Sequence, residues 1–492
     1  MQSVAGAAQQ ITCNKEPNPA MDIHFPLFSF AYKAAVLHHV ETVLFFWAVC
    51  LSLLTLSPNA HSVERPESVV PSVQEHPYLF ITRSDIPDIM ARVEKHDWAK
   101  KTYEGILENA ERLLEEDLIP PPSTGRHSMV YMCPDCGGLL KTLSPTEHQC
   151  KDCQKIHTGM PFDAVLYKSQ HGKLENAAMT LGLASLFTGK DVYARKALEI
   201  LLKYADVYDT YPMINPYGEP RANGARIYDQ TLNEAIWLVS ISWAYDLILA
   251  TDVATTEEKR HVEEHLIRPS VMTVRKNPSN RISNWQTWHN AGMLAAGLCL
   301  RDQEIIDHAL LADGGYFYQL EHSIKEEGMQ YEGSWSYHFY ALHAFLKTAE
   351  MGHKSGLNTY GHEPLRRALL LPLQMAMPNG KLPAIHDGTE WAPSTTYYEY
   401  AAARYDEPAF EDFLAQHKRV GWEALLMGID DPQPHPTPLQ SVVLNDSGLA
   451  VLRRGGSYLL LDFGEHGGGH GHYDKLNVVY FTQGSVVASD PG

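Results

Sequence analysis

Apolar residues recur at three- and four-residue spacing along most of the chain between residues 77 and 432. Side chains at this spacing share one face of an α-helix, so the pattern predicts a largely helical region. Short stretches of Gly, Pro, Asn or Asp separate the periodic segments and mark helix ends. The clearest segments are 176–205, 226–250, 255–268, 284–300, 303–325, 338–352 and 397–416. We expect successive antiparallel helical hairpins, and a closed ring of helix pairs would give the same pattern.

The pattern changes after Pro432, where short apolar runs replace the helical period. SGLAVLRR and YLLLDFG flank the turn residues GGS, and NVVYFT and SVVAS flank QG. Each pair of runs predicts a β-hairpin. We therefore expect a β domain that occupies residues 440–492 and is cut off at Gly492.

The first 62 residues are an N-terminal extension with one apolar run, VLFFWAVCLSLLTLS, at 43–57. The run is too short to span a bilayer comfortably, and with the small residues near Ser62 it resembles a secretory signal. An uncleaved membrane anchor and a misassigned start are the alternatives. We expect an exported protein that is periplasmic, cell-surface or extracellular. A polar linker at 63–76 leads to HPYLFITRSDIPDIMARV, in which Ser84 is the expected helix cap.

Length and charge narrow the class of protein. At 492 residues the chain exceeds what one hydrophobic core usually serves, so two or more domains are expected. Asp and Glu number 59 against 40 Lys and Arg, which gives a formal net charge of −19. This charge disfavours a broad electrostatic surface for nucleic acid, and we expect no such partner. A polyanionic substrate would need a locally basic or polar cleft.

Four of the seven cysteines fall in one short segment, CPDCGGLLKTLSPTEHQCKDC, at 133–153. Its two CxxC pairs have the spacing of a zinc ribbon, and the glycines after the first pair permit a tight turn. The four residues are Cys133, Cys136, Cys150 and Cys153. Two disulfides are the alternative in an exported protein. In either case we expect a structural role, because a closed four-thiolate site has no open position for chemistry.

Two polar stretches interrupt otherwise apolar helical sequence. RISNWQTWHNAG, at 281–292, places Asn284, His289 and Asn290 at the start of a helix, whose free backbone amides suit an anionic group. EEGMQYEGSWSYHFYALHAF, at 326–345, is crowded with ionisable side chains, namely Tyr331, Glu332, Tyr337, His338 and Tyr340. A tyrosine phenol can act as a general acid or base when a neighbouring charge shifts its pKa. Taken singly, the stretches also fit a capped helix with a core histidine and an aromatic core face.

The third polar stretch, GGGHGHYDKLNVVYFTQGSVVASDPG, begins with glycines that permit a tight bend or close approach to a ligand. In an extended strand, His470, His472 and Asp474 would share one face, because successive side chains alternate. The QG hairpin would return Asp490 to the His472 end, roughly opposite Asn477. We therefore expect His472 and Asp490 to bind one metal ion; two protein ligands are too few for zinc, so a third would come from elsewhere. A solvated Gly/His loop is the alternative.

Together the three stretches resemble the heparinase II/III and oligoalginate lyase group of polysaccharide lyases. The resemblance rests on SNWQTWHNAG, EEGMQYEGSWSYHFY and GHGHYDKLNVVYFTQGSVVASDPG and extends over residues 77–492. It implies an incomplete (α/α) toroid at 77–432, followed by an antiparallel β-sandwich that is truncated at the C-terminus, with the active cleft between them. It also implies a zinc ion held by His472, Asp490 and a later histidine beyond residue 492.

The resemblance further implies catalytic roles. A polar side chain at the position of Asn284 or His289 neutralises the uronate carboxylate, Tyr337 protonates the leaving oxygen, and His470 assists. These residue types suit the reaction. Removal of the C5 proton of a uronate requires hydrogen bonds or positive charge to stabilise the enolate-like dianion, and a tyrosine can protonate the C4 oxygen.

Other residues are expected along the path of the substrate. Arg226, Gln230 and Glu234 share one helical face at four-residue spacing in ARIYDQTLNEAIW, although a surface salt-bridge stripe fits equally well. His386 and Asp387, in LPAIHDGTEW, lie on a predicted loop between helices and can contact sugar. The remaining expected contacts are Asn290, Glu332 and Tyr340.

These observations favour a carbon–oxygen lyase that cleaves a uronate-containing acidic polysaccharide or oligosaccharide, alginate-like or heparin-like, by β-elimination. A toroid-type glycoside hydrolase is one rival, with Asp387 and Glu332 as its carboxyl pair. A non-catalytic carbohydrate-binding protein with the same fold is another. Only elimination gives an unsaturated uronate that absorbs in the ultraviolet. The polymer, exo or endo cleavage and the oligomeric state stay open.

Overall fold

The computed structural model describes residue 71 and residues 75–221, 224–465 and 470–490. The described residues belong to one compact unit, Arg65–Gly492. The N-terminal extension, its apolar run and nearly all of the expected linker lie outside them. None of the helices formed by the described residues has both the length and the apolar character that a membrane span requires.

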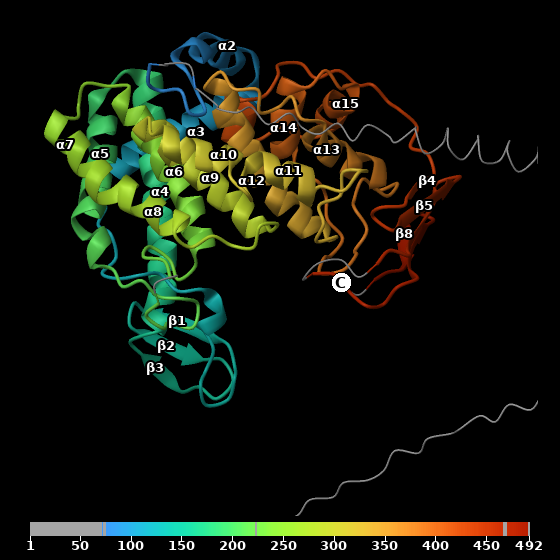
Figure 1. Cartoon of the computed structure of the whole chain (residues 1–492), viewed down its shortest axis with the longest axis horizontal. Coiled ribbons are helices and arrows are strands. Elements are labelled where there is room, and N and C mark those ends of the chain that lie inside the picture. Colours follow the sequence, from blue (N-terminus) through green and yellow to red (C-terminus); the bar gives the residue numbers. More distant parts are fainter. Residues whose placement is uncertain (1–70, 72–74, 222–223, 466–469, 491–492) are drawn as a thin grey trace, which may run out of the picture. The chain divides into compact units, whose positions relative to one another are not determined.

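The described helices of the first part lie packed side by side (Figure 1). Their contacts define a closed ring in which each member packs on the next. In order around the ring they are α3 (Asp97–Leu114), α4 (Phe162–Thr188), α6 (Thr231–Leu249), α9 (Asn284–Leu300), α12 (Trp335–Lys354), α14 (Thr395–Arg404) and α16 (Gly421–Leu426). The last of these, α16, packs back against α3 and closes the ring. The prediction of a toroid of helix pairs is confirmed.

A second set of helices packs outside the ring, most of them directly against its members. These helices are α2 (Ile86–Lys95), α5 (Asp191–Val207), α7 (Thr256–Val262), α8 (Arg268–Arg275), α10 (Gln303–Leu311), α11 (Tyr316–Ser323), α13 (Glu363–Met375) and α15 (Pro408–Gln416). Short turns of other helix types are η1 (Arg83–Asp85), η2 (Ser128–Val130), η3 (Tyr208–Thr210) and η4 (Glu263–Ile267). From α4 to α16 an outer helix lies between successive ring helices and returns the chain, so these ring helices run in the same direction. The segments that lead into α6, α9, α12 and α14 therefore meet at one end of the ring.

The composition of α6 and α9 explains why these two helices are buried in the packing of the ring. Both are apolar around nearly their whole circumference, as expected of helices covered on all sides. They also approach closely at Gly292, where a Cβ atom would lie 2.7 Å from the carbonyl oxygen of Ala235. A larger residue at this position would push the two helices apart.

The structure corrects several predicted helix boundaries. The segment 176–205 is two helices, because Gly189 adopts a left-handed φ of 67° and ends α4. The segment expected to begin at residue 226 begins at Thr231. The helix α13 was missed because Pro372 lies inside it. At the start of the fold, Thr82 rather than Ser84 caps the first turn.

A small antiparallel sheet is inserted between α3 and α4. Its strands, in spatial order, are β1 (Leu140–Ser144), β2 (Glu147–Cys150) and β3 (Ile156–Thr158). Cys133, Leu140 and Cys150 form its buried core, against which Tyr131 and Phe162 pack. We call residues 133–158 the cysteine box.

The C-terminal part forms one antiparallel sheet with its strands in sequence order. They are β4 (Val442–Leu444), β5 (Leu449–Arg454), β6 (Ser457–Asp462), β7 (Asn477–Thr482) and β8 (Ser485–Ala488). Both predicted hairpins are confirmed, since Arg454 pairs with Ser457 and Thr482 with Ser485. The described residues supply one layer of the expected sandwich. The sheet is joined to the end of α13 by a 3.1 Å hydrogen bond from the hydroxyl of Tyr458 to the carbonyl oxygen of Met375.

Candidate functional site

Side chains from four separate segments meet at the end of the ring where α9, α12 and α14 begin. We call this group the polar cluster. Its members are Asn284, Glu332, Tyr337, Asp387, His470 and His472. Asn284 opens α9, where the hydroxyl of Ser283 accepts a hydrogen bond from the amide of Gln286 and caps the helix. The cap fixes the position of Asn284 at the rim of the ring.

Asn284 and Glu332 form a buried pair. Nδ2 of Asn284 lies 3.0 Å from both carboxylate oxygens of Glu332. The two oxygens of one carboxylate are too close together to accept both amide hydrogens at good angles, so one N–H is shared between them. The second N–H of Asn284 is left for another acceptor. Glu332 also accepts a hydrogen bond from the hydroxyl of Tyr331 at 3.2 Å.

Tyr337 and His470 stack face to face beside this pair. Their ring centroids are 3.4 Å apart and their planes are inclined by 13°. Asp387 lies behind His470, with Oδ2 at 2.8 Å from Nδ1. The other carboxylate oxygen, Oδ1, lies 2.8 Å from Nε2 of His472. One carboxylate therefore bridges two histidines from the C-terminal part.

The electrostatics of the polar cluster separate a proton donor from an ionised acceptor. Burial raises the pKa of Tyr337, and the charges of Asp387 and Glu332 raise it further, so the phenol keeps its proton at neutral pH. Hydrogen bonds from His470 and His472 lower the pKa of Asp387. The hydrogen bond to Asp387 in turn raises the pKa of His472.

A possible metal-binding group adjoins the polar cluster. One ligand atom from each of His472, Asp474 and Asp490 lies within 4.8 Å of the others. The expectation that residues 470–474 form a strand is wrong, because β7 begins only at Asn477 and the preceding residues form a loop. The loop still brings His472 to Asp490, and it adds Asp474 as a third oxygen or nitrogen donor. This donor set supplies three of the four ligands that a tetrahedral zinc ion takes.

Buried side chains support this loop through contacts that the sequence did not predict. The backbone amide of His472 donates to Nδ1 of His386 at 3.2 Å. Nε2 of His386 lies 3.5 Å from Asp462, whose carboxylate also pairs with Lys475 at 3.0 Å. His386 therefore supports the loop from below and is buried, although the sequence predicted a contact to sugar. Nothing in the sequence links Asp462, at the end of β6, to this position.

His289 does not join the polar cluster. It lies five residues after Asn284 on α9, which turns its side chain by about 140° around the helix axis. The side chain is fully buried, and neither ring nitrogen has a hydrogen-bond partner among the described residues. Burial lowers its pKa to about 3. Its position gives no support to the predicted catalytic role, because no part of it is exposed to a substrate.

Two further predicted contacts to substrate lie inside the helical packing. Both polar atoms of the Asn290 carboxamide form hydrogen bonds within the protein. Its oxygen accepts from Nε2 of Gln286 at 2.9 Å, and its nitrogen donates to the carbonyl oxygen of Gly314 at 2.8 Å. Tyr340 is half-buried against Trp288. Burial and the neighbouring Tyr337 raise the pKa of Tyr340 to about 12.

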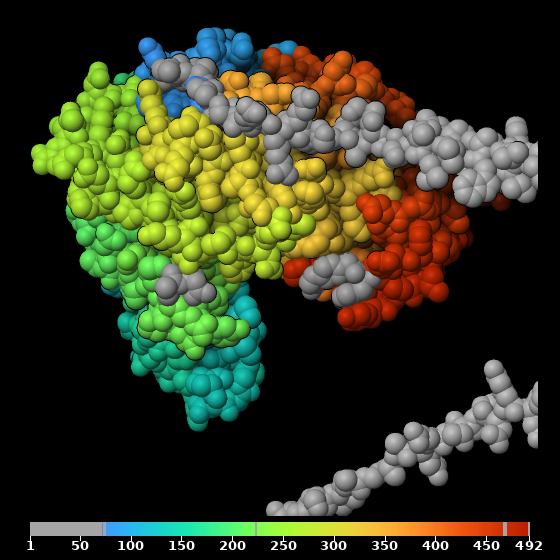
Figure 2. Space-filling model, viewed as in Figure 1, coloured from blue at the N-terminus to red at the C-terminus, as the bar shows by residue number. Residues whose placement is uncertain are grey.

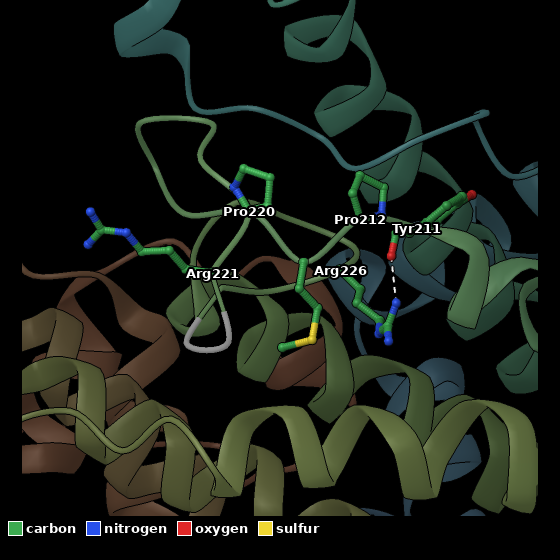
Figure 3. A pocket seen from close by; sticks show the side chains of 6 residues that line it. Tyr211, Pro212, Pro220, Arg221 and Arg226 are labelled. Atoms are coloured by element: carbon green, nitrogen blue, oxygen red, sulfur yellow. Dashed lines mark hydrogen bonds between the residues drawn. The ribbon is translucent and has the colours of Figure 1, made fainter.

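A groove runs along the loop that leads into α6, at the same end of the ring (Figure 3). One cavity of about 490 Å³ is lined by Tyr211, Pro212, Met213, Pro220, Arg221 and Arg226. A second, of about 230 Å³, shares Met213 and Arg226 with the first and adds Lys276. We call the two cavities together the arginine groove. Arg226 donates to the carbonyl oxygen of Tyr211 at 2.6 Å. The side chain of Arg221 points away from Arg226 (Figure 3).

The predicted common helical face of Arg226, Gln230 and Glu234 is wrong, because α6 begins at Thr231. Gln230 is the residue before the helix, and its side-chain oxygen accepts from Asn233 at 3.0 Å. Glu234 is buried and accepts backbone N–H groups, including that of Ile227 at 2.7 Å. It anchors the loop that carries Arg226 rather than lining the groove.

The cysteine box brings its four thiols together. Sγ of Cys133 lies 3.7 Å from Sγ of Cys153, and Sγ of Cys136 lies 3.5 Å from Sγ of Cys150. All four sulfurs lie within 4.8 Å of one another. Disulfide bonds require about 2.05 Å, so these distances do not match the alternative of two disulfides. Thiolates about 2.3 Å from a tetrahedral zinc ion are about 3.8 Å apart, which the observed distances approach.

Polar groups approach two of the thiols of the cysteine box. The amides of Asp152 and Cys153 each donate to Sγ of Cys150 at 3.4 Å. Nε2 of His157, which lies outside both CxxC pairs, is 3.3 Å from Sγ of Cys133. Figure 2 shows the cysteine box (teal) just below the loop of the arginine groove (green). Arg126, which precedes the box in the sequence, contacts that loop, since its Nη2 donates to the carbonyl oxygen of Pro216 at 2.9 Å.

Two family models match the sequence. The model described as alginate lyase matches residues 91–379, and the model described as heparinase II/III-like, C-terminal, matches residues 436–492. An alginate lyase of Stenotrophomonas maltophilia is 28% identical over 359 residues, which cover 66% of this chain and 47% of that protein. An exo-oligoalginate lyase of Saccharophagus degradans is 23% identical over 462 residues, which cover 87% of this chain and 57% of that protein. The chain thus spans about half the length of these curated relatives.

Two solved structures have a partly similar course of the chain. Heparan sulfate lyase HepC from Pedobacter heparinus has a TM-score of 0.46 at 14% identity, over 84% of this chain and 66% of that one. Alginate lyase A1-III from Sphingomonas species A1 has a TM-score of 0.45 at 15% identity, over 72% of this chain and 99% of that one.

Proposed function

This chain belongs to the alginate lyase family, and from that membership we propose that it cleaves a uronate-containing acidic polysaccharide or oligosaccharide by β-elimination. The curated relatives named above act on alginate or its oligomers by their names. We therefore expect an alginate-like substrate first and a heparin-like substrate second.

The observation that carries the proposal is the juxtaposition of Asn284, Tyr337 and His470 at one end of the ring. In a β-elimination the C5 proton leaves, the C4–O bond breaks and a C4=C5 double bond forms. The free N–H of Asn284 can donate to the substrate carboxylate and stabilise the charge that develops when C5 is deprotonated. Glu332 holds the amide in place for this contact.

Tyr337 and His470 divide the two proton transfers. With its raised pKa, the phenol of Tyr337 is protonated at neutral pH and can protonate the leaving C4 oxygen. Because Nδ1 of His470 faces Asp387, Nε2 of His470 is the ring nitrogen left to accept the C5 proton. Both groups belong to one stacked pair, so a sugar ring placed beside that pair meets donor and acceptor together.

The same geometry disfavours a glycoside hydrolase. The hydrolytic alternative needs one carboxyl group with a raised pKa to act as general acid. The pKa of Asp387 is instead lowered by His470 and His472. Glu332 is bound to the amide of Asn284 and to Tyr331. Neither carboxyl group is placed to protonate a leaving oxygen.

The arginine groove supports an acidic substrate. It lies at the same end of the ring as the polar cluster, and its lining has three cationic side chains, Arg221, Arg226 and Lys276, against one acidic side chain, Asp209, in a chain whose net charge is −19. A polyanion would otherwise be repelled by such a protein. We propose that the groove receives a distal part of a long uronate chain.

We propose two zinc ions with structural roles. One would be bound by Cys133, Cys136, Cys150 and Cys153, whose sulfur–sulfur distances support a tetrahedral site. The other would be bound by His472 and Asp490, with Asp474 as a further donor within reach. In each case the ion would brace a small β structure, and no proton transfer passes through it.

Export remains a proposal that rests on the sequence at 43–57. A secreted or periplasmic location would give the protein access to polysaccharides outside the cell. Cell fractionation of a host that expresses the full chain, followed by N-terminal sequencing, tests both export and cleavage near Ser62.

A direct assay tests the function. The full chain is incubated with alginate, heparin, heparan sulfate and a neutral glucan, and ultraviolet absorbance is followed alongside the number of new reducing ends. A lyase gives both signals in equal amounts on a uronate polymer and neither on the glucan. New reducing ends without ultraviolet absorbance would identify a hydrolase, and neither signal on any uronate polymer would contradict the proposal.

A further inference from the structure

Asp387 occupies an unusual place in the polar cluster. Its two carboxylate oxygens contact two different histidines, Nδ1 of His470 and Nε2 of His472, each at 2.8 Å. The helical part of the chain supplies the carboxylate, and the C-terminal part supplies both imidazoles. An ionised carboxylate only accepts hydrogen bonds, so both histidines must present an N–H to it.

The backbone around Asp387 fixes the direction of this carboxylate. The carbonyl oxygen of Asp387 accepts hydrogen bonds from the hydroxyls of Ser334 at 2.9 Å and Ser336 at 3.0 Å. The amide of Asp387 donates to the carbonyl oxygen of His470 at 3.3 Å. The preceding residue, His386, has a φ of 53°, a left-handed conformation that is costly for a residue with a side chain. The loop accepts this strain in the conformation that points Asp387 at the two histidines.

We propose that Asp387 is a positioning residue that joins the reacting histidine, His470, to the metal-binding histidine, His472, through one carboxylate. This inference rests on the proposed function, which gives His470 its part in proton transfer. Asp387 itself touches no reacting atom.

The bridge has a separate consequence for each histidine. With Nδ1 directed at Asp387, His470 presents Nε2 on the edge of a ring that is already fixed by stacking on Tyr337. The same carboxylate holds Nε2 of His472, the histidine that we propose as a metal ligand. Carboxylates that hold the second nitrogen of a metal-binding histidine orient the ring and raise its basicity. The sequence motif GHGH thus depends on a residue from the loop at 386–387.

The first test leaves Asp387 unchanged. The full chain is labelled with ¹⁵N-histidine, and the ¹⁵N shifts and couplings of His470, assigned with His470→Gln, report which ring nitrogen carries the proton. We expect the proton on Nδ1 of His470. A proton on Nε2 would overturn the proposal.

The second test uses Asp387→Asn, which keeps the size of the side chain but offers one acceptor oxygen instead of two. We expect kcat on the best uronate substrate to fall by about tenfold to a hundredfold with KM changed by less than about threefold, because outer carboxylates of this kind have effects of that size. The affinity of the zinc-loaded protein for zinc, measured by competition with a chelator, should fall as well. The matched control is Glu390→Gln, an exposed carboxylate on the same loop that pairs with Lys381.

The outcomes separate this inference from the proposed function. Unchanged kcat and zinc affinity in Asp387→Asn would overturn the positioning role while the lyase activity of the parent protein stands. No activity of the parent on any uronate polymer would contradict the proposed function instead, and the tautomer and zinc measurements would still decide whether Asp387 holds the two histidines. A thermal melt of each variant shows whether it is folded, and Asp387 is half-exposed, so we expect little change.

Discussion

The cysteine box and the polar cluster are both groups of ligand-type side chains, but they are assembled in opposite ways. The four thiols of the box come from residues 133–153, a single insert with its own small sheet and core. The polar cluster draws Asn284, Tyr337, Asp387 and His470 from four segments that only the ring of helices brings together.

This difference has consequences for chemistry. The box is closed, because its sulfurs contact one another and leave no space for a substrate. The polar cluster is open, because Tyr337, His470 and His472 remain half-exposed and one N–H of Asn284 is unused within its pair. We therefore expect damage to the box to change metal content and local stability, and damage to the cluster to change turnover.

The largest expected effect is on turnover and concerns Tyr337. Tyr337→Phe keeps the ring that stacks on His470 and removes the proton donor, so kcat should fall by about a hundredfold or more while the melting temperature changes little. Tyr331→Phe and Tyr340→Phe are the matched controls, because both phenols lie in the same stretch. If either control loses turnover and Tyr337→Phe keeps it, the proton donor has been assigned to the wrong tyrosine.

The next prediction separates two neighbouring histidines within the cluster. In a version of the protein that binds zinc in its C-terminal part, His472→Ala should lower zinc content and melting temperature together. His470→Ala should lower kcat by about tenfold to a hundredfold and leave zinc content nearly intact. Metal analysis and kinetics on the same preparations decide the matter. Equal loss of zinc from both variants would mean that the two histidines are joint ligands.

For the cysteine box we expect the opposite pattern, in which zinc content changes and turnover does not. Cys150→Ser should remove one zinc ion per chain and make residues 133–158 sensitive to protease, because metal binding and local folding are coupled in such sites. Turnover of a short uronate oligomer should stay within about twofold, since no thiol touches the polar cluster. Cys299→Ser, in the buried interior of α9, is a control that should keep the full zinc content. Full zinc content in Cys150→Ser would contradict the proposed site.

A smaller effect is expected from the arginine groove. Arg221→Ala combined with Lys276→Ala removes two charges at the groove, and KM for a long uronate polymer should rise severalfold while KM for a trisaccharide stays the same. The control is Arg260→Ala, an exposed arginine on α7 that pairs with Glu264 away from the groove. An equal rise in KM for short and long substrates would show that the groove is not a distal contact.

The smallest expected effect is on the pH dependence of stability, which should have opposite signs for a buried histidine of the ring and for a histidine of the polar cluster. Burial lowers the pKa of His171 to about 4, whereas an unfolded chain has a histidine pKa of about 6.5. Between these values the unfolded state binds more protons, so the free energy of unfolding should fall as the pH drops from about 6.5 towards 4. The raised pKa of His472 has the opposite sign in metal-free protein, because its stabilisation is present below about pH 6.5 and is lost as the pH rises.

Urea unfolding at several pH values checks this prediction. His171→Gln should flatten the loss of stability on the acid side, whereas His322→Gln, on an exposed position of α11, should leave the slope unchanged. An unchanged slope in His171→Gln would mean that this histidine does not contribute to the acid sensitivity.

The sequence by itself determined the parts of this protein that depend on neighbouring residues. The helical period predicted α9 at residues 284–300, and turn residues predicted both C-terminal hairpins, because hydrogen bonds in helices and tight hairpins join residues that are close in the chain. The spacing of Cys133, Cys136, Cys150 and Cys153 predicted that their thiols meet, since two tight turns are enough to bring them together.

Only the tertiary structure decided which polar side chains face the same space. His289 and Asn284 are close in sequence, but helix geometry turns His289 into the packed interior. Asp387 and His470 are far apart in sequence, yet they are in hydrogen-bond contact because the ring aligns the starts of α9, α12 and α14 at one end and the C-terminal loop folds onto that end. The bridging role of Asp387 and the support from Asp462 beneath His386 follow from this packing, for which local spacing carries no signal.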